Sequence, residues 1–294
     1  MNIKLQKIKE VSMKTVFIIC ACVSIVAVLL ICLFLFANGL PTIGKIGVGE
    51  FLLGRVWKPL EDKFGILPMI IGSIYVTAGA IIIGVPIGVL SAVFLAKFCP
   101  KPIYKVLKPA VDLLAGIPSI VYGFFGLVVI VPIMQSLFGG GGKSVLTASV
   151  MLGIMILPTI ISVSESAIRA VPESYYEGAL ALGATHERSI YCTVLPAAKS
   201  GITAGVILGI GRAIGEAMAV NMVAGNQAQI PNSIFAGVRT LTSNIVLEMG
   251  YATDLHREAL IATAVVLFVF ILIINLLFSL VKKDKKDKKR RKAK

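Results

Sequence analysis

The sequence predicts an all-α membrane protein with six transmembrane helices. Its 294 residues are 57% hydrophobic and 15% charged, whereas soluble proteins average about 45–50% and about 25%. Apolar runs of about 20 residues recur along the chain, and each is long enough to cross a bilayer core of ~30 Å. Because the runs are long and lack alternation, we expect helices, which satisfy their own backbone hydrogen bonds in lipid. Soluble, collagen-like, disordered and disulfide-stapled classes are therefore excluded.

Each span is placed by an apolar run and its polar flanks. Residues 1–15 form an N-terminal segment, residues 16–281 the membrane domain and residues 282–294 a basic tail. The predicted spans are 16–36, 69–96, 110–134, 145–164, 201–224 and 259–281, with the loop 165–200 between the fourth and the fifth. The first run follows four lysines, as in a signal peptide. It is longer than the apolar region of a signal and lacks a clear cleavage site, so we expect an uncleaved span.

The basic residues predict which side of the membrane each loop faces. The side with both termini, residues 97–109 and residues 165–200 has 21 Lys and Arg, and the other side has 7. Because Lys and Arg accumulate in cytoplasmic loops, both termini are expected in the cytoplasm of a multi-pass protein of the cell membrane. The tail holds 10 of these cations, which attract anionic headgroups. Nucleic-acid binding is the alternative, but the chain has no second basic face with interleaved aromatic residues.

No constellation in the sequence predicts a cofactor, a metal site or a catalytic centre. The five cysteines form no CxxC pair, and the two histidines fall on opposite sides of the predicted membrane, which argues against zinc sites and a disulfide framework. Residues 139–144 resemble a phosphate-binding P-loop, but Leu137 stands where that motif requires its first glycine. We therefore expect that the chain is not itself an ATPase.

Prolines and glycines inside the spans predict kinks and close helix contacts. Each of Pro86, Pro118, Pro132 and Pro158 removes a backbone donor. Small residues at four-residue spacing, which let helices approach closely, are Gly84/Gly88, Gly205/Gly209 and Gly211/Gly215.

The loop 165–200 predicts two short helices joined at a glycine. A proline followed by an acidic residue suits a helix start. Residues 173–182 are expected to form the first helix and residues 185–194 the second, with Gly183 between them. Such a pair on the cytosolic side is either a docking surface for a partner or a plain connector at the headgroups.

One pattern in this loop resembles the coupling ("EAA") loop of ABC importer permeases. The matching residues are Glu177, Ala179, Gly183, Ala184, Leu195 and Pro196. Gly178 departs from the motif, since it stands where the first alanine is usual. The resemblance implies a type I ABC importer permease (MetI-like) fold, in which the loop seats in a cleft of a separate ATPase subunit.

Two further segments resemble phosphate importer permeases. One is LAGIPSIVYG at 114–123, and the other is Trp57-Lys58-Pro59 followed by FGILP at 64–68. The second is similar to subunits of the PstC type rather than the PstA type. The resemblance implies import of inorganic phosphate together with a PstB-type ATP-binding subunit dimer, a PstA-type second permease and a PstS-type phosphate-binding protein.

The external loops are expected to receive that binding protein. Residues 37–68 and 225–258 are long enough for this purpose. Within the second of these loops, residues 231–249 are expected to lie as an amphipathic helix at the outer interface.

A charged pair lies inside the fifth predicted span. Arg212 is near the midpoint of 201–224, where a charge costs about 2.5–3.5 kcal/mol. Glu216 follows one helical turn later on the same face, so the two side chains can pair. They either neutralise each other between helices, or Arg212 lines an oxyanion pathway while Glu216 orients it. A guanidinium matches phosphate oxygens with two parallel donors, and the resemblance also implies functional weight for this pair.

Asp112 and Glu165 are further candidates. Both lie near the cytoplasmic ends of their predicted spans, where they can reach water. They are either boundary residues or parts of a gate.

Two alternative functions are left open by the sequence. A permease of the same class for sulfate or molybdate has the same features. An ion-coupled secondary carrier or channel uses Arg212 and Glu216 as a proton relay, but it has no reason to carry the coupling loop.

Overall fold

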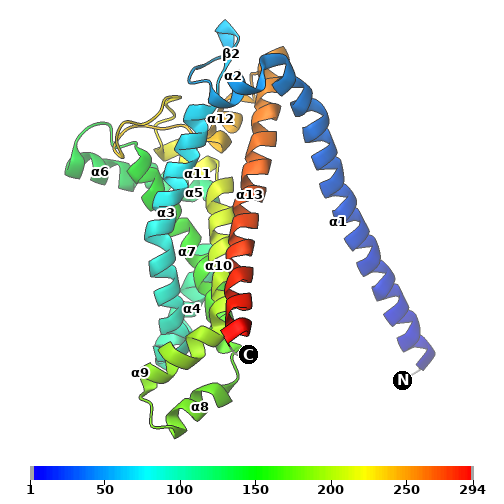
Figure 1. The fold of residues 1–294 in the computed structure, drawn as a ribbon, viewed down its shortest axis with the longest axis vertical. Coiled ribbons are helices and arrows are strands. Elements are labelled where there is room, and N and C mark those ends of the chain that lie inside the picture. The colour runs from blue at the N-terminus through cyan, green and yellow to red at the C-terminus, as the bar shows by residue number, and fades with distance from the viewer. Residues whose placement is uncertain (1–2, 293–294) are drawn as a thin grey trace.

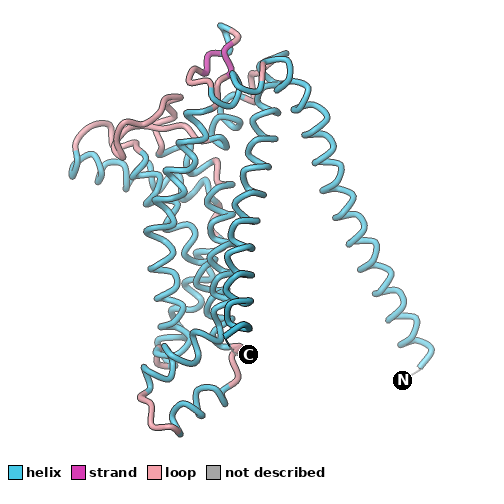
Figure 2. The backbone as a smooth tube through the Cα atoms, in the orientation of Figure 1, coloured by secondary structure: helices cyan, strands magenta, loops and turns pink. Residues whose placement is uncertain are grey.

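The protein is almost entirely helical in the computed structural model (Figures 1 and 2). The structure describes the backbone of residues 3–292 and the side-chain surroundings of residues 10–277. The side chains of the predicted basic tail, 282–294, lie outside the described part. A two-stranded antiparallel hairpin pairs Trp57 with Phe64 in the connection between the first two spans.

The elements follow one another with short connections. The α-helices are α1 (Ile3–Ile46), α2 (Val48–Leu53), α3 (Leu67–Val93), α4 (Lys101–Gly116), α5 (Ser119–Phe125), α6 (Val131–Phe138), α7 (Val145–Arg169), α8 (Glu173–Ala181), α9 (His186–Ser189), α10 (Leu195–Gly215), α11 (Met218–Val223), α12 (Leu241–Glu248) and α13 (Asp254–Lys292). The strands are β1 (Trp57–Lys58) and β2 (Lys63–Phe64), joined by a 3₁₀ turn, Pro59–Glu61. Single π-helical turns occupy Phe94–Phe98, Gly126–Ile130 and Ile190–Val194.

Six helical segments of the described chain are long and apolar enough to cross a membrane, which confirms the predicted fold class. They are Glu10–Ile46, Leu67–Phe98, Ser119–Phe138, Val145–Arg169, His186–Gly215 and Asp254–Leu277. Most are longer than the predicted apolar runs because the helix continues through the flanking residues.

Two spans differ from their predicted bounds because the backbone leaves the helix. Ile117 and Pro118 are extended between α4 and α5, so the third apolar segment starts at Ser119 rather than at residue 110. Pro118 has no N–H to donate, and it biases the residue before it away from helix. The fifth helix ends at Gly215 because Glu216 is extended, and the predicted continuation to residue 224 becomes the separate helix α11.

Helix α7 is the centre of the bundle and packs against α3 and α10. Glycines allow this contact, since a Cβ on Gly84 would lie 2.8 Å from the Gly153 carbonyl oxygen and one on Gly209 would lie 2.7 Å from Ile160. The small-residue prediction is therefore confirmed for two of the three glycine pairs. It is wrong for Gly211 and Gly215, where a Cβ meets nothing within 4 Å. That face of α10 is open.

Helix α1 stands away from the other helices over most of its length (Figures 1 and 2). Close to its C-terminal end it contacts α13, where the rings of Phe36 and Phe268 meet edge to face with centroids 5.8 Å apart. Every residue from 10 to 31 is exposed. This apolar half of α1 is available to lipid or to another subunit.

The connections divide between the two ends of the bundle. Helices α8 and α9 lie at the end where α1 starts and α13 finishes, and α2 and the β hairpin lie at the opposite end (Figure 1). The prediction of an amphipathic helix over residues 231–249 is wrong. Only Leu241–Glu248 is helical in that stretch, and Leu241, Asn244 and Glu248 are buried in it. Its contacts with α3, α11 and α13 bury residues that a surface helix would expose.

Candidate functional site

Arg212 lies in the last turn of α10, immediately before a break in the helix. Glu216 is extended, and α11 starts two residues later. Broken helices at membrane depth occur where the freed backbone groups are buried in protein or line a cavity. The break therefore marks a place where the bundle interior is polar.

Two hydrogen bonds of Glu216 hold this break. Its carboxylate Oε1 accepts the backbone N–H of Ala219 at 3.0 Å, which caps the first turn of α11. Its carbonyl oxygen accepts the hydroxyl of Thr242 at 2.8 Å. Glu216 thus joins α11 to α12.

Arg212 is half-buried, and its Nη1 donates to the Thr159 hydroxyl of α7 at 3.2 Å. None of the ion pairs among the described residues includes Arg212. A guanidinium inside a membrane span thus has a hydroxyl partner and no carboxylate within 4.0 Å in the described part of the chain. The guanidinium charge is therefore not neutralised by any ion pair among the described residues.

The predicted pairing of Arg212 with Glu216 is wrong. A pair four residues apart requires a continuous helix, but the helix ends between the two residues and the Glu216 carboxylate turns to the N–H of Ala219. Sequence reasoning also missed Thr159, because a single threonine in an apolar helix gives no distinctive signal.

The predicted coupling loop forms an elbow of helices, residues 173–195, at the end of α7. Gly183 has a φ of +80°, which ends α8, and the Thr185 hydroxyl accepts the Arg188 N–H at 3.3 Å to start α9. No residue of Glu173–Ala181 is buried, and Leu182 at the tip is 91% exposed. The base of the elbow is anchored instead, since Ile190 and Val194 pack with Ile168 of α7. The elbow is thus a rigid projection with a free tip.

The structure brings the two other candidate acids together in an inner cluster, which we define as Tyr104, Lys108, Asp112, Glu165 and Arg169. Glu165 is 2% exposed and accepts Tyr104 Oη at 2.7 Å and Arg169 Nε at 2.8 Å. Lys108 Nζ lies 3.1 Å from Glu165 and 3.0 Å from Asp112. Asp112 is 52% exposed, as expected for a boundary residue. The expectation that Glu165 reaches water is wrong, because α4 covers it.

A second buried acid, which sequence reasoning missed, forms an outer cluster of Trp57, Arg239, Glu248 and His256. The two Glu248 oxygens accept Trp57 Nε1 at 2.8 Å and Arg239 Nη1 at 2.6 Å, and His256 Nε2 lies 2.8 Å away. Trp57 and Glu248 are 191 residues apart in the chain. No local pattern predicts such a contact.

The hairpin anchored by Trp57 carries an exposed charged tip. Hydrogen bonds and charge from Lys58 and Lys63 lower the pKa of the Glu61 carboxyl from 4.5 to about 2. The tip therefore keeps its ion pairs throughout the pH range in which cells grow.

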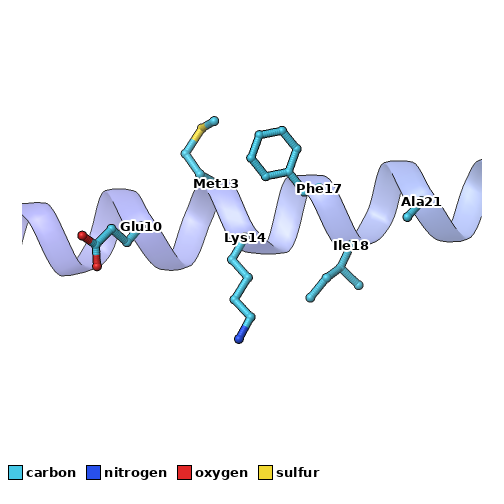
Figure 3. Close-up of a pocket in the computed structure, with 6 residues that line it drawn as sticks. All are labelled: Glu10, Met13, Lys14, Phe17, Ile18 and Ala21. Atoms are coloured by element: carbon cyan, nitrogen blue, oxygen red, sulfur yellow. The ribbon is translucent and has the colours of Figure 1, made fainter. Parts of the chain in front are cut away.

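Two other features carry no chemistry. The hollow drawn in Figure 3 lies against α1 and is lined by Glu10, Met13, Lys14, Phe17, Ile18 and Ala21. These residues belong to one helix, so they enclose no binding site. The P-loop-like residues 139–144 form a turn between α6 and α7, where the Ser144 hydroxyl caps α7 by accepting the Thr147 N–H at 3.2 Å.

A six-span membrane bundle with a helix break at an intramembrane arginine and an exposed elbow at one end fits a transport permease that a separate subunit drives. The chain belongs to the family described as binding-protein-dependent transport system inner membrane component, whose profile matches residues 84–287. This membership confirms the resemblance drawn from the coupling loop.

Relatives in bacteria and archaea match nearly the whole chain. A probable ABC transporter permease protein, YqgH of Bacillus subtilis (strain 168), is 41% identical over 93% of this chain and 92% of its own. The phosphate transport system permease protein PstC of Mesorhizobium japonicum is 38% identical over 82% and 80%. A probable PstC of Methanocaldococcus jannaschii is 30% identical over 93% and 92%.

Solved structures support the fold. The inward-facing MetNI methionine ABC transporter matches with a TM-score of 0.60 at 18% identity, over 78% of this chain and 99% of that chain. A bacterial ABC transporter that imports alginate matches with a TM-score of 0.64 at 13% identity, over 95% and 99%. At these identities the likeness extends to the fold alone, which is that of the MetI-like permeases.

Proposed function

We propose that this chain is the PstC-type permease subunit of an ABC importer and that it passes inorganic phosphate across the cell membrane. The observation that carries the proposal is Arg212, an intramembrane guanidinium without a carboxylate partner among the described residues. Such a charge is costly in a span unless it faces a cavity or a partner. A passing oxyanion meets that requirement.

Phosphate fits this site better than a neutral solute does. A guanidinium offers parallel N–H donors that match two phosphate oxygens, and the open Gly211 face of α10 leaves space beside Arg212. Several relatives at 30–38% identity bear the name of phosphate transport permeases. Glu216, by capping α11, holds the break that presents Arg212.

Three exposed surfaces support the proposed partners, which the PstC-type resemblance implies. The exposed tip of α8 suits the cleft of a PstB-type ATP-binding subunit dimer, which hydrolyses the ATP. The uncovered apolar half of α1 suits packing on a PstA-type second permease. The hairpin end of the bundle suits docking of a PstS-type phosphate-binding protein.

The proposed orientation puts both termini and the elbow in the cytoplasm. The excess of 21 over 7 cations supports it. It also agrees with the start of α1 and the end of α13 lying at the same end of the molecule as α8 and α9 (Figure 1).

Uptake of labelled phosphate by proteoliposomes that contain the complete importer tests the proposal. Wild-type vesicles are expected to accumulate phosphate when ATP and binding protein are supplied, and excess sulfate or molybdate is expected not to compete. Arg212→Ala is expected to lower uptake by about 100-fold or more, since one charged contact is worth about 3 kcal/mol when desolvated, while assembly persists. Phosphate uptake by the variant at the wild-type rate would refute the role of Arg212 in the pathway. Competition by sulfate or molybdate would show that phosphate is not the specific substrate.

A further inference from the structure

Helix α4 is attached to the bundle mainly through polar contacts. No residue of Lys101–Gly116 is buried, and its principal neighbour is α7. The contacts are Tyr104 and Lys108 to Glu165, Lys108 to the Ser162 hydroxyl at 3.1 Å, and the Tyr104 ring beneath the Arg169 guanidinium at 4.4 Å. Glu165 receives two side chains of α4, so it is the centre of this attachment.

Glu165 also lies close to the point where the elbow meets α7. Arg169, which donates to Glu165, is the last residue of α7, and α8 starts at Glu173. The Arg169 Nη2 atom donates to the Leu95 carbonyl at the end of the second span at 2.8 Å. Glu165 and Arg169 thus lie in the last turns of α7, directly before the elbow.

The far end of α4 leads towards Arg212. The Leu114 carbonyl accepts the Tyr122 hydroxyl of α5 at 2.8 Å across the break at residues 117–118. Helix α5 then packs on α11, since a Cβ on Gly123 would lie 2.8 Å from Ala219 Cα. Ala219 is the residue whose N–H Glu216 caps. A chain of direct contacts thus runs from the end of α7, where the elbow begins, through α4 and α5 to the helix break after Arg212.

We propose that Glu165 is a positioning residue that makes α4 move with α7, so that movement of the elbow reaches the helix break at Arg212. This inference rests on the proposed function, because it assigns the step between ATP hydrolysis and anion passage. A buried carboxylate that holds two cations and a phenol fixes the two helices to each other while it is charged. Without the charge, the elbow can move while α4 stays behind.

The test is the number of phosphate ions taken up per ATP hydrolysed, measured in proteoliposomes that contain the whole importer. Glu165→Gln keeps the side-chain shape and removes the charge. We expect this variant to hydrolyse ATP near the wild-type rate. The number of phosphate ions taken up per ATP is expected to be roughly tenfold lower, which is the size of a typical coupling between two sites. Glu165→Asp, which keeps the charge on a shorter side chain, is expected to recover part of the ratio. Lys105→Met, on the exposed face of the same helix, is the matched control and is expected to keep it.

Equal losses of hydrolysis and uptake, with an unchanged ratio, would overturn the inference, because they indicate a purely structural role. If Glu165→Gln is not recovered from membranes, Tyr104→Phe removes a single hydrogen bond to Glu165. A ratio about fivefold lower is then expected, and an unchanged ratio overturns the inference. Wild-type vesicles that take up no phosphate contradict the proposed function instead, and the ratio is then measured with sulfate or molybdate.

Discussion

Two buried glutamates hold opposite ends of this permease, and their surroundings differ. Glu248, 8% exposed, accepts donors from three separate elements, and its partners Arg239 and His256 are at most 17% exposed. Glu165 is also buried, at 2% exposed, but Arg169 beside it is 45% exposed, and Lys108 is shared with the exposed Asp112. The outer cluster is closed, whereas the inner cluster opens to water.

This difference indicates which end moves. A buried network whose members are all satisfied is rigid, because any rearrangement leaves a polar group unpaired. In the inner cluster, the pair of Lys108 with the exposed Asp112 can exchange with water at little cost, because exposed ion pairs contribute about 0–1 kcal/mol, while Glu165 keeps its buried contacts with α4. We therefore expect the end with the outer cluster to be the fixed frame of the permease and the end next to the elbow to be its moving part.

The largest expected loss of stability follows a substitution in the outer cluster. Glu248→Gln leaves Arg239 without its anionic partner in a buried site, which costs about 3–5 kcal/mol. We expect a large fall in the thermal midpoint of the purified importer and a low yield from membranes. Glu258→Gln, at the exposed pair with Lys45, is the control and is expected to leave both nearly unchanged. A Glu248→Gln protein with the wild-type thermal midpoint would contradict the view that the Glu248 cluster holds its end of the permease rigid.

A smaller loss of stability is expected when a single hydrogen-bond donor of the outer cluster is removed. Trp57→Phe keeps an aromatic ring against Phe64 but removes the N–H that donates to Glu248. A hydrogen bond to a charged group contributes about 1.5–3 kcal/mol. The thermal midpoint should fall by roughly half as much as for Glu248→Gln. An equal fall would indicate that the ring, and not the carboxylate, organises the outer end.

At the inner end, the shape of the elbow is the sensitive feature. Gly183→Ala introduces a Cβ at a φ of +80°, which costs about 1–2 kcal/mol. A cost of this size corresponds to a factor of roughly 5–30 in an equilibrium constant. We therefore expect the amount of ATP-binding subunit that co-purifies with the permease to fall by about this factor. Gly178→Ala, in the helical part of the same loop with nothing near its Cβ, should keep full recovery. Equal recovery for both variants would show that docking does not depend on the bend.

The smallest effect is expected at the hairpin tip. Glu61→Gln removes two exposed ion pairs and should leave the thermal midpoint at pH 7 almost unchanged. The pKa of Glu61 is lowered from 4.5 to about 2, so its contribution is present above pH 4.5 and is lost as the pH falls towards 2. Midpoints of the variant and the wild type, measured at both ends of this range, should therefore converge at low pH. A difference that grows on acidification would contradict this sign.

Local features of the sequence were sufficient to predict the membrane-spanning helices and the elbow. Long apolar runs predict spans whatever their neighbours are, and Gly183 with its flanking residues predicts the bend because the cause is in the backbone itself. Pro118 predicted only a kink within a span over 110–134, and the structure shows a full break there. These features depend on residues a few positions apart, which a sequence displays directly.

The features that sequence reasoning missed depend on distant partners. The break at Glu216 has no proline, and it is held by Ala219 and by Thr242, 26 residues away. The partners of Glu165 and Glu248 are spread over four or more helices and loops. A continuous helix and an Arg212–Glu216 pair were therefore the natural expectation, and tertiary contacts overrode it.

The claim that a separate ATPase drives this chain from the cytoplasm is tested by one cysteine at the tip of the elbow. Leu182→Cys, in a chain whose five native cysteines are replaced by serine, puts a thiol at a residue that is 91% exposed. In intact cells an impermeant maleimide should leave this thiol unlabelled, and in inverted vesicles a short cross-linker should join it to the ATP-binding subunit. Labelling from outside intact cells would contradict both the proposed orientation and the claim that a cytoplasmic ATPase drives this chain.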